Sequence, residues 1–342
     1  MVTSIKEETF SPCIAYTGTR PVEYAAVPLT MYSTGADHLE SYTSMSALLE
    51  HFYAEKNTLT RIRQKSSDLR RIVQTALERD IKKYDLQLAQ MKDTEKREKY
   101  RIYGELLNTY GYSAKPGDKS LTAVNYYTNE PVTIPLDPTL SATENAKKYF
   151  DKYGKLKRTY EALSELTTQV KEEIDHLETI STALDIALKE EDLVEIKEEL
   201  TQSGYIRRKG GTKKAKITSK PFHYLSSDGF HIYVGKNNFQ NDELTFKFAN
   251  GNDWWFHAKG IPGSHVVVKT EGKELPDRTF EEAGRLAAYY SKGREQEKVE
   301  IDYVQKKQVK KPAGAKPGFV VYYTNYSLMI DSDISGIEKI SD

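Results

Sequence analysis

Residues 252–266 read NDWWFHAKGIPGSHV and hold both tryptophans of the chain, two of its seven histidines and a Pro-Gly turn. Large and small side chains alternate from Trp254 to Lys259, Pro262-Gly263 marks a turn, and a valine run follows. This pattern predicts two strands of one sheet. The turn would bring His257 and His265 close together. Aromatic faces, imidazoles and a lysine beside a glycine turn are typical of a site for a planar or phosphate-bearing ligand.

Each of these side chains also has a purely structural explanation. A tryptophan can anchor a core, and backbone groups can satisfy a buried histidine. Adjacent residues of a strand point to opposite faces, so we expect one of Trp254 and Trp255 to be core and the other exposed. Two histidines without a third ligand at suitable spacing make a poor metal site. Since the single Cys13 lies far away in sequence, we expect no metal site.

Two stretches of the C-terminal part carry a resemblance to a known family. The motif DxWFH at residues 253–257, followed by PGSH at 262–265 and VKKPxGAKPG at 309–318, is similar to the NFACT-R domain of the bacterial RqcH family. Members are often named fibronectin-binding protein A. Residues 145–156 and 195–200 resemble the coiled-coil middle region of that family. Full members begin with an NFACT-N domain and a helix-hairpin-helix module. The sequence shows no signal for either, so we expect the chain to correspond to the C-terminal part of a longer protein.

The resemblance implies a translation factor. Such a factor would bind the obstructed large ribosomal subunit through ribosomal RNA and a stalk-base protein, recruit alanyl-tRNA, and promote C-terminal alanine tailing of the stalled nascent chain. The residues that select tRNA would lie chiefly in the N-terminal part of the family. The older family name implies an alternative, an adhesin that binds host fibronectin. The first function places the protein in the cytoplasm, and the second places it at the cell surface after non-classical export.

The distribution of charge favours a polyanionic partner. The chain has 50 basic and 50 acidic residues, yet residues 205–319 hold 22 Lys and Arg against 13 Asp and Glu, a surplus of nine. Residues 305–318 hold five lysines and no acid. Nucleic acid is the commonest polyanion for such a region, although lysines that only maintain solubility give the same pattern. The predicted RNA-contact residues are Trp254, Trp255, His257, Lys259, His265, Lys306, Lys307, Lys310, Lys311 and Lys316.

Two long helical arms are predicted at residues 44–91 and 142–188. Apolar residues of the second arm recur at alternating steps of four and three from Tyr149 to Leu184, which is the heptad pattern of a coiled coil. The first arm follows one phase from Leu59 to Ala76 and another phase from Leu77 to Met91. Nearly equal arms predict an antiparallel hairpin about 70 Å long. The first arm is basic over residues 61–83, either because it pairs with the acidic second arm or because it contacts ribosomal RNA.

These features predict an α+β protein in four parts. Residues 1–43 form a short N-terminal segment, a remnant of an upstream region. Residues 44–204 form a long antiparallel coiled-coil stalk with a small β-hairpin in a tip at about 93–141. Residues 205–219 form a basic linker, and residues 220–342 form a globular α+β domain like NFACT-R. Within that domain we expect a helix at about 241–249 and another helix that begins at a capping box made by Thr279 and Glu282.

Several functional classes are disfavoured. The sequence has no Walker loop, dinucleotide fingerprint, nucleophile elbow or zinc-hydrolase helix. We therefore expect a binding protein and not an enzyme, with no catalytic residue and no cofactor. No run of about 18 apolar residues occurs, so no membrane insertion is predicted.

Overall fold

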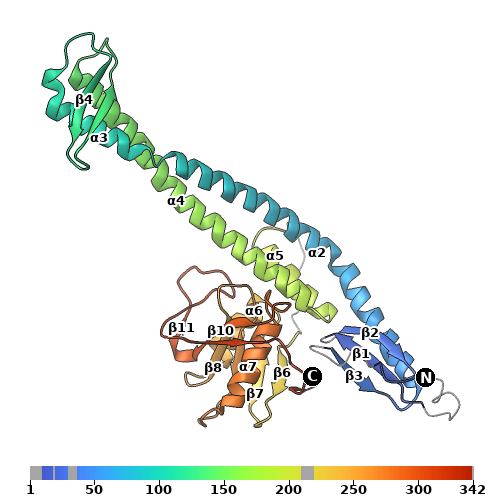
Figure 1. Ribbon diagram of the computed structural model, residues 1–342. Coiled ribbons are helices and arrows are strands. Elements are labelled where there is room, and N and C mark those ends of the chain that lie inside the picture. The colour runs from blue at the N-terminus through green and yellow to red at the C-terminus, as the bar shows by residue number, and fades with distance from the viewer. Residues whose placement is uncertain (1–9, 18–19, 30–36, 209–218, 341–342) are drawn as a thin grey trace. The chain divides into compact units, whose positions relative to one another are not determined.

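The computed structural model describes residues 10–17, 20–29, 37–208 and 219–340 (Figure 1). Two compact units are present, one made of Met1–Ala76 and Asp175–Asp342 and the other of Leu77–Ile174. The helical elements are α2 (Met45–Asp93), α3 (Arg97–Tyr110), η2 (Gly111–Ser113), α4 (Ala142–Ile186), α5 (Glu190–Gln202), α6 (Asn238–Glu243), η3 (Leu244–Phe248), α7 (Asp277–Tyr289) and η4 (Lys306–Gln308). The strands are β1 (Cys13–Thr17), β2 (Arg20–Ala25), β3 (Asp37–Ser41), β4 (Ser120–Asn125), β5 (Glu130–Pro135), β6 (Phe222–Leu225), β7 (His231–Val234), β8 (Trp254–Ala258), β9 (Val266–Val268), β10 (Val299–Gln305), β11 (Val309–Lys310), β12 (Val321–Tyr322), β13 (Tyr326–Ile330) and β14 (Glu338–Lys339). Long helices and a separate multi-stranded sheet confirm the predicted mixture of helix and sheet.

An antiparallel sheet of seven strands is the centre of the C-terminal domain. Its strand order is β13-β10-β8-β9-β7-β6-β14, and the two strands predicted from the tryptophan-rich stretch lie side by side as β8 and β9. One face packs against α7, where Phe256, Val266 and Val268 meet Ala283 and Leu286 (Figure 1). This alternation of side chains between faces is what a strand pattern with period two requires.

A second, smaller core lies on the opposite face of the same sheet. Trp255, Val267 and Val304 project from three neighbouring strands and pack against Leu244 of η3 and Val309 of β11. The helix predicted at 241–249 is in fact divided between α6 and η3, a π-helical turn in which the Ala249 N–H bonds to the Leu244 carbonyl, 2.8 Å away. Both faces of β8 are therefore covered.

The predicted capping box of α7 is wrong. The helix begins at Asp277 after Pro276, and Thr279 and Glu282 are used for contacts with the β6–β7 turn. The Thr279 hydroxyl donates to Asp228 at 2.8 Å, and Glu282 accepts from the Ser227 N–H at 2.9 Å. A Thr-x-x-Glu sequence shows that two side chains can form hydrogen bonds. It does not show whether their partners are the backbone N–H groups of the helix end or groups of a neighbouring loop.

The two long arms begin and end close to the predicted positions. The Ser44 hydroxyl accepts a hydrogen bond from the Ala47 N–H at 3.1 Å, and α2 follows it for 49 residues. Ser141 and Glu144 form a reciprocal capping box at the start of α4, with the Ser141 N–H 2.8 Å from the Glu144 carboxylate. Satisfying the free N–H groups in this way fixes the first turn of a helix.

The two helices run in opposite directions within each unit. In the first unit the Arg70 guanidinium donates to the Leu184 carbonyl at 2.6 Å, and Arg61 pairs with Glu190. In the second unit the Thr167 hydroxyl lies 3.5 Å from the Met91 sulfur. A coiled coil along the whole length stays a prediction.

The predicted change of heptad phase in the first arm is correct only in part, because Leu77, Tyr84 and Met91 of the second phase are half-buried but its other two residues are not. Ile81 and Leu88 of the expected second phase are exposed, whereas Asp80 and Gln87 are buried. These two positions continue the seven-residue spacing of Val73, which belongs to the first phase. A search for apolar periodicity passes over buried positions that hold a carboxylate or an amide side chain. The sequence therefore predicts a second phase from the apolar residues next to them.

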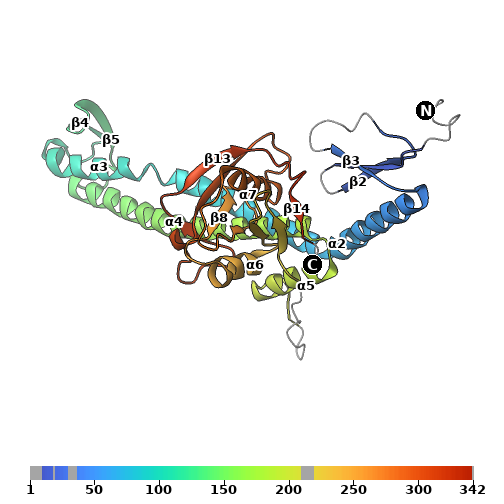
Figure 2. The ribbon, with the colours of Figure 1, turned by 90° about the horizontal axis from the view of Figure 1, so that it is seen from below.

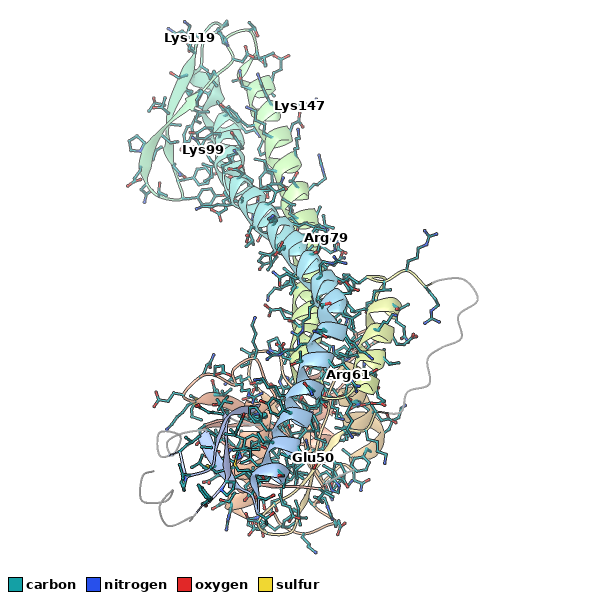
Figure 3. All side chains as sticks on the ribbon, turned by 90° about the vertical axis from the view of Figure 1, so that its right-hand side faces the viewer. Glu50, Arg61, Arg79, Lys99, Lys119 and Lys147 are labelled. Carbon is teal, nitrogen blue, oxygen red and sulfur yellow. The ribbon has the colours of Figure 1, made fainter. Side chains whose placement is uncertain are left out.

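Cations of the first arm are partly neutralised within the chain. Arg61 and Lys65 both contact Glu190, and Arg70 contacts Asp185. Figure 3 shows Arg61 and Arg79 among the side chains of α2. The interpretation that the first arm pairs with the second is thus confirmed for Arg70 and Asp185, whereas Arg61 and Lys65 pair with Glu190 of α5.

The unit formed by Leu77–Ile174 has its own small core. The predicted β-hairpin is present as β4 and β5, and its Leu121 and Ile134 pack against Leu106 and Leu107 of α3 (Figure 2). The buried Asn145 side chain closes the turn before α4 by bonding to three backbone carbonyls. The hairpin and α3 together enclose this core, and their place at the tip of a stalk stays a prediction.

The N-terminal segment and the linker differ in what the structure describes. Strands β1, β2 and β3 form a three-stranded sheet in the order β2-β1-β3, and Ile14 and Tyr16 pack on Leu48 and Phe52 of α2. No strand was predicted for this segment, because its apolar runs are short and scattered. Most of the predicted basic linker, residues 209–218, lies outside the described residues.

Candidate nucleic-acid interface

Strand β8 positions the tryptophan-rich stretch at the centre of the sheet. It lies between β9 and β10, with Trp255 opposite Val267 on one side and Val304 on the other. Trp255 and His257 point to the face that carries η3, whereas Trp254 and Phe256 point to the face that carries α7. The adjacent tryptophans therefore belong to two different cores.

Trp255 is a core residue. Its side chain has no exposed surface and lies against Leu244, Val267 and Val309. The ring of His265 meets its edge at a centroid distance of 5.0 Å. The prediction that Trp255 contacts RNA is wrong, because a fully covered ring cannot stack on a base, and the structure assigns it to packing.

The two histidines come together as predicted, with ring centroids 5.5 Å apart. His265 is buried and its Nδ1 lies 2.8 Å from the Thr245 hydroxyl. Burial lowers the pKa of His257 to about 4, and burial together with the neighbouring His257 lowers the pKa of His265 well below its usual value. Both are therefore neutral at pH 7 and supply no positive charge for a phosphate. The expectation that His265 contacts RNA is corrected, because its ring is enclosed.

Trp254 is only partly exposed. It lies in an aromatic group with Phe280, Tyr303 and Tyr326, at centroid distances of 4.9, 5.8 and 6.5 Å. The expectation of one core and one exposed tryptophan is thus confirmed for Trp255 and corrected for Trp254, whose neighbours cover much of its ring.

The lysine-rich turn lies at the end of β10. Backbone bonds anchor it to the turn before β8, since the Lys306 N–H donates to the Asp253 carbonyl at 2.8 Å and the Lys307 N–H to the Gly251 carbonyl at 3.0 Å. The Lys306 ammonium lies 5.9 Å from the centre of the Phe246 ring. Lys307 and Lys310 are exposed. Among the described residues no ion pair is present for these three lysines, so their charges are open to a ligand.

The other predicted lysines are placed differently. Lys259 lies 2.6 Å from the Glu300 carboxylate and 3.8 Å from Asp302. Lys311 pairs with Asp242, and Lys316 is partly buried. These three cations are less available to an external anion than their position in an acid-poor stretch suggested.

Sequence analysis missed the aromatic residues beside this turn. Phe246, Lys247 and Phe248 belong to η3, and Phe248 is 41% exposed with the Lys269 ammonium 4.8 Å above its ring. A regular helix over residues 241–249 gives no reason to single out these side chains. The π-helical turn changes their direction, and no local pattern announces that turn.

Exposed and half-buried cations and rings of η3 and the lysine-rich turn make up a candidate surface, the basic–aromatic face, which consists of Phe246, Lys247, Phe248, Lys306, Lys307 and Lys310. Cations track a phosphate backbone and exposed rings stack on bases, so this combination is typical of single-stranded nucleic-acid binding. No group of three or more His, Cys, Asp or Glu side chains that could hold a metal ion occurs in the described parts of the chain. The C-terminal domain is thus an α+β domain that carries cations and aromatic rings on η3 and the lysine-rich turn.

Comparison with known sequences shows the family. The family model described as "NFACT N-terminal and middle domains" matches residues 1–219, and the model described as "NFACT protein RNA binding domain" matches residues 220–323. The chain belongs to the NFACT family. The first match also covers residues 1–43, and its model describes the N-terminal and middle domains together.

Several relatives are similar over most of this chain. It is 41% identical to the Rqc2 homolog RqcH of Streptococcus suis over 90% of its length, and 36% identical to the Rqc2 homolog RqcH of Bacillus subtilis over 98%. It spans 55% and 59% of those two proteins. The solved structure of the C-terminal part of the fibronectin/fibrinogen-binding protein from Streptococcus suis is 37% identical, with a TM-score of 0.65, and the match covers 81% of this chain and 99% of that one.

The packing role of Trp255 leads to a stability prediction. We expect Trp255→Ala to lower the free energy of unfolding by about 3 to 5 kcal/mol, because it leaves a cavity in the centre of the sheet. Trp254→Ala should cost less, since part of that ring is already solvated. Denaturant unfolding followed by circular dichroism compares the two variants. Equal effects would contradict the assignment of the rings to differently covered faces.

The depressed pKa values of the two imidazoles lead to a prediction of acid sensitivity. Their folded-state pKa values lie below the unfolded value, so the stability they contribute is present above about pH 6.5 and is lost as pH falls through about 4. We expect His257→Gln to reduce the loss of unfolding free energy over this range by about 2 to 3 kcal/mol. His38→Gln changes an exposed imidazole and is the matched control. The same pH dependence in wild type and His257→Gln would reject the burial argument.

Proposed function

We propose that this chain supplies RNA contacts to a ribosome quality-control factor, and that residues 220–342 bind RNA through the basic–aromatic face. The observation that carries the proposal is the open position of Lys306, Lys307 and Lys310 beside the rings of η3. Similarity to proteins named Rqc2 homolog RqcH and the match to an RNA-binding domain support the ribosomal context.

The partners of such a factor extend beyond a single RNA strand. We infer that the factor binds the obstructed large ribosomal subunit through ribosomal RNA and a stalk-base protein, and that it engages tRNA during C-terminal alanine tailing of stalled chains. The long helices would form a coiled-coil stalk, and the chain would bind its partners without catalysing a reaction. A factor of this kind would act in the cytoplasm. None of the described helices is long and apolar enough to cross a membrane.

The basic–aromatic face can be tested by reversing its exposed charges. We expect Lys307→Glu combined with Lys310→Glu to weaken binding of the full chain to a single-stranded RNA by about tenfold or more. The slope of log affinity against log salt should become shallower by about 0.7 for every phosphate that the variant no longer neutralises. Exposed charges contribute little to folding, so thermal unfolding should be unchanged. Fluorescence anisotropy at several salt concentrations measures both quantities, and co-sedimentation with purified large subunits extends the test.

The matched control for this experiment is Lys298→Glu. Lys298 is exposed and precedes β10, at the end of the strand opposite the lysine turn. The same reduction in affinity for the control would mean that net charge alone determines binding. Unchanged binding by the double variant would show that Lys307 and Lys310 only maintain solubility.

A second candidate function is binding of fibronectin. The observation in its favour is the similarity to a solved structure described as part of a fibronectin/fibrinogen-binding protein. A lysine-rich face can attract acidic protein surfaces as well as RNA, so both functions could use the same cations. They differ in their response to salt, because a site with a defined shape persists when exposed charges are screened.

We expect any binding of fibronectin to be weak and to disappear as ionic strength rises. The Lys307→Glu and Lys310→Glu double variant should abolish it together with RNA binding, since the same exposed charges would carry both. Surface plasmon resonance with immobilised fibronectin, at low and physiological salt, measures this dependence. Submicromolar affinity at physiological salt that persists in the double variant would make adhesion the primary function.

A further inference from the structure

Three carboxylates of α5 are buried in contact with residues of the C-terminal domain. Asp192, Glu195 and Glu199 are 1%, 3% and 0% exposed, and their spacing places them on one face of the helix. The Lys236 ammonium lies 3.3 Å from Asp192. Burying charged groups is unfavourable unless they are paired and hydrogen-bonded, so three acids on one helix face require dedicated partners.

Amide side chains supply most of those partners. Asn237 and Gln240 donate to Glu195 at 2.7 and 2.8 Å, and Asn238 donates to Glu199 at 2.7 Å. These donors come from α6 and the residue that caps it, and Figure 2 shows α5 beside α6. The helix that follows the long arms is thus fastened to α6 by an array of buried hydrogen bonds.

Helix α6 in turn holds the segment that follows the lysine turn. Asp242 accepts a hydrogen bond from the Gly318 N–H at 3.1 Å and pairs with the Lys311 ammonium. Residues 311–318 are therefore tied to α6 at both ends. Because this segment directly follows Lys310, its position affects the position of the basic–aromatic face.

Asn238 connects the two sets of contacts. Its amide nitrogen donates to Glu199 and to the Thr179 hydroxyl, each at 2.7 Å. Its carbonyl oxygen faces Gly318, where an added Cβ would lie 2.3 Å away. The backbone of Gly318 thus lies directly against an amide group whose orientation is fixed by Glu199 together with Thr179. A change in the docking of α5 would therefore move the Asn238 amide and alter its contact with Gly318.

We propose that α5 is a latch that acts through Asn238 and Asp242 to set the conformation of residues 311–318 and so to position Lys307 and Lys310 for RNA. In this proposal Glu199 is a positioning residue, since it touches no residue of the basic–aromatic face. The latch rests on the RNA-binding function proposed above for that face. It also couples the region matched by the N-terminal and middle family model to the RNA-binding domain.

The electrostatics of the latch add a dependence on pH. Burial, with smaller contributions from the nearby carboxylates of Glu195 and Asp242, raises the pKa of Glu199 to about 8. His176 of α4 also faces this carboxylate, with its Nε2 3.7 Å from the Glu199 oxygen. The folded-state pKa exceeds the unfolded value of 4.5, so the stabilisation is present below about pH 4.5 and is lost as pH rises through about 8. The latch is therefore expected to loosen at alkaline pH.

Two glycines of the same segment allow a matched test. Gly318 and Gly314 have φ values of 79° and 77°, so alanine at either position carries similar backbone strain. An added Cβ at Gly314 meets nothing within 4 Å, whereas at Gly318 it collides with Asn238. We expect Gly318→Ala to weaken RNA binding several-fold more than Gly314→Ala. Equal effects would show that contact with α6 is irrelevant to the face.

The latch itself is tested with Glu199 variants of the full chain. Glu199→Leu removes one of the two acceptors of the Asn238 amide and should accelerate amide hydrogen exchange in residues 311–318 by about tenfold, which corresponds to about 1.4 kcal/mol. Glu199→Gln keeps a carbonyl acceptor that cannot ionise, so it should preserve slow exchange and abolish its increase between pH 7 and 9, after correction for intrinsic rates. Glu191→Gln changes an exposed acid of the same helix and is the control.

Hydrogen exchange and RNA affinity together distinguish the latch from the function on which it rests. Unchanged exchange in Glu199→Leu, in a protein that remains folded by circular dichroism, would reject the latch whether or not RNA binds. Faster exchange with unchanged affinity, in a chain that does bind RNA, would reject its role in positioning the lysines. Faster exchange with weaker RNA binding would support the proposal. A wild-type chain that binds no RNA would overturn the proposed function, while the exchange data would still decide whether α5 controls the segment.

Discussion

Burial of both faces of β8 is the constraint on which the C-terminal domain depends. A strand with two covered faces must divide its side chains between two cores, and Trp255 and Phe256 are the largest fully buried side chains that β8 gives to them. The His265 imidazole is then buried and the His257 imidazole half-buried, and both are neutral at pH 7. An unpaired charge inside either core would be strongly destabilising, so lysines without an ion-pair partner are expected where the strands end. The position of the lysine turn at the end of β10 follows from this division.

Much of the fold could be predicted from periodicity and turn residues. Strands β8 and β9, the β4–β5 hairpin and both long helices follow from patterns that are local in sequence. The second heptad phase of α2 and the capping box of α7 could not be predicted correctly, because each depends on partners that are distant in sequence. Asp80 is buried in the seam although it is a carboxylate, and Thr279 bonds to a loop 51 residues away. Local patterns identify which bonds are possible, and tertiary packing selects among them.

The candidate site was predictable in its cations but not in its chemistry. The acid-poor stretch of residues 305–318 correctly indicates a cluster of lysines. It cannot show that Lys311 forms an ion pair with Asp242, 69 residues earlier in the chain. Residue type does not reveal the burial of Trp255 either, because a tryptophan can pack in a core or stack on a base. The exposed rings of η3 were missed because a π-helical turn has no periodicity distinct from that of an amphipathic helix over five residues.

The small number of open cations limits what the C-terminal domain can achieve alone. Lys306, Lys307 and Lys310, with neutral aromatic neighbours, provide a few phosphate contacts and some stacking. Contacts of this kind give non-specific affinities on the order of micromolar or weaker at physiological salt. Tight binding to one site on a large ribonucleoprotein then requires other surfaces of the same chain, because each additional tethered contact acts at a high effective concentration. Contacts that fix the conformation of the lysine turn before RNA binds would also increase affinity. They reduce the conformational entropy that is lost on binding. The buried acids of α5, which are costly to maintain away from water, are consistent with selection for such preorganisation and not for stability alone.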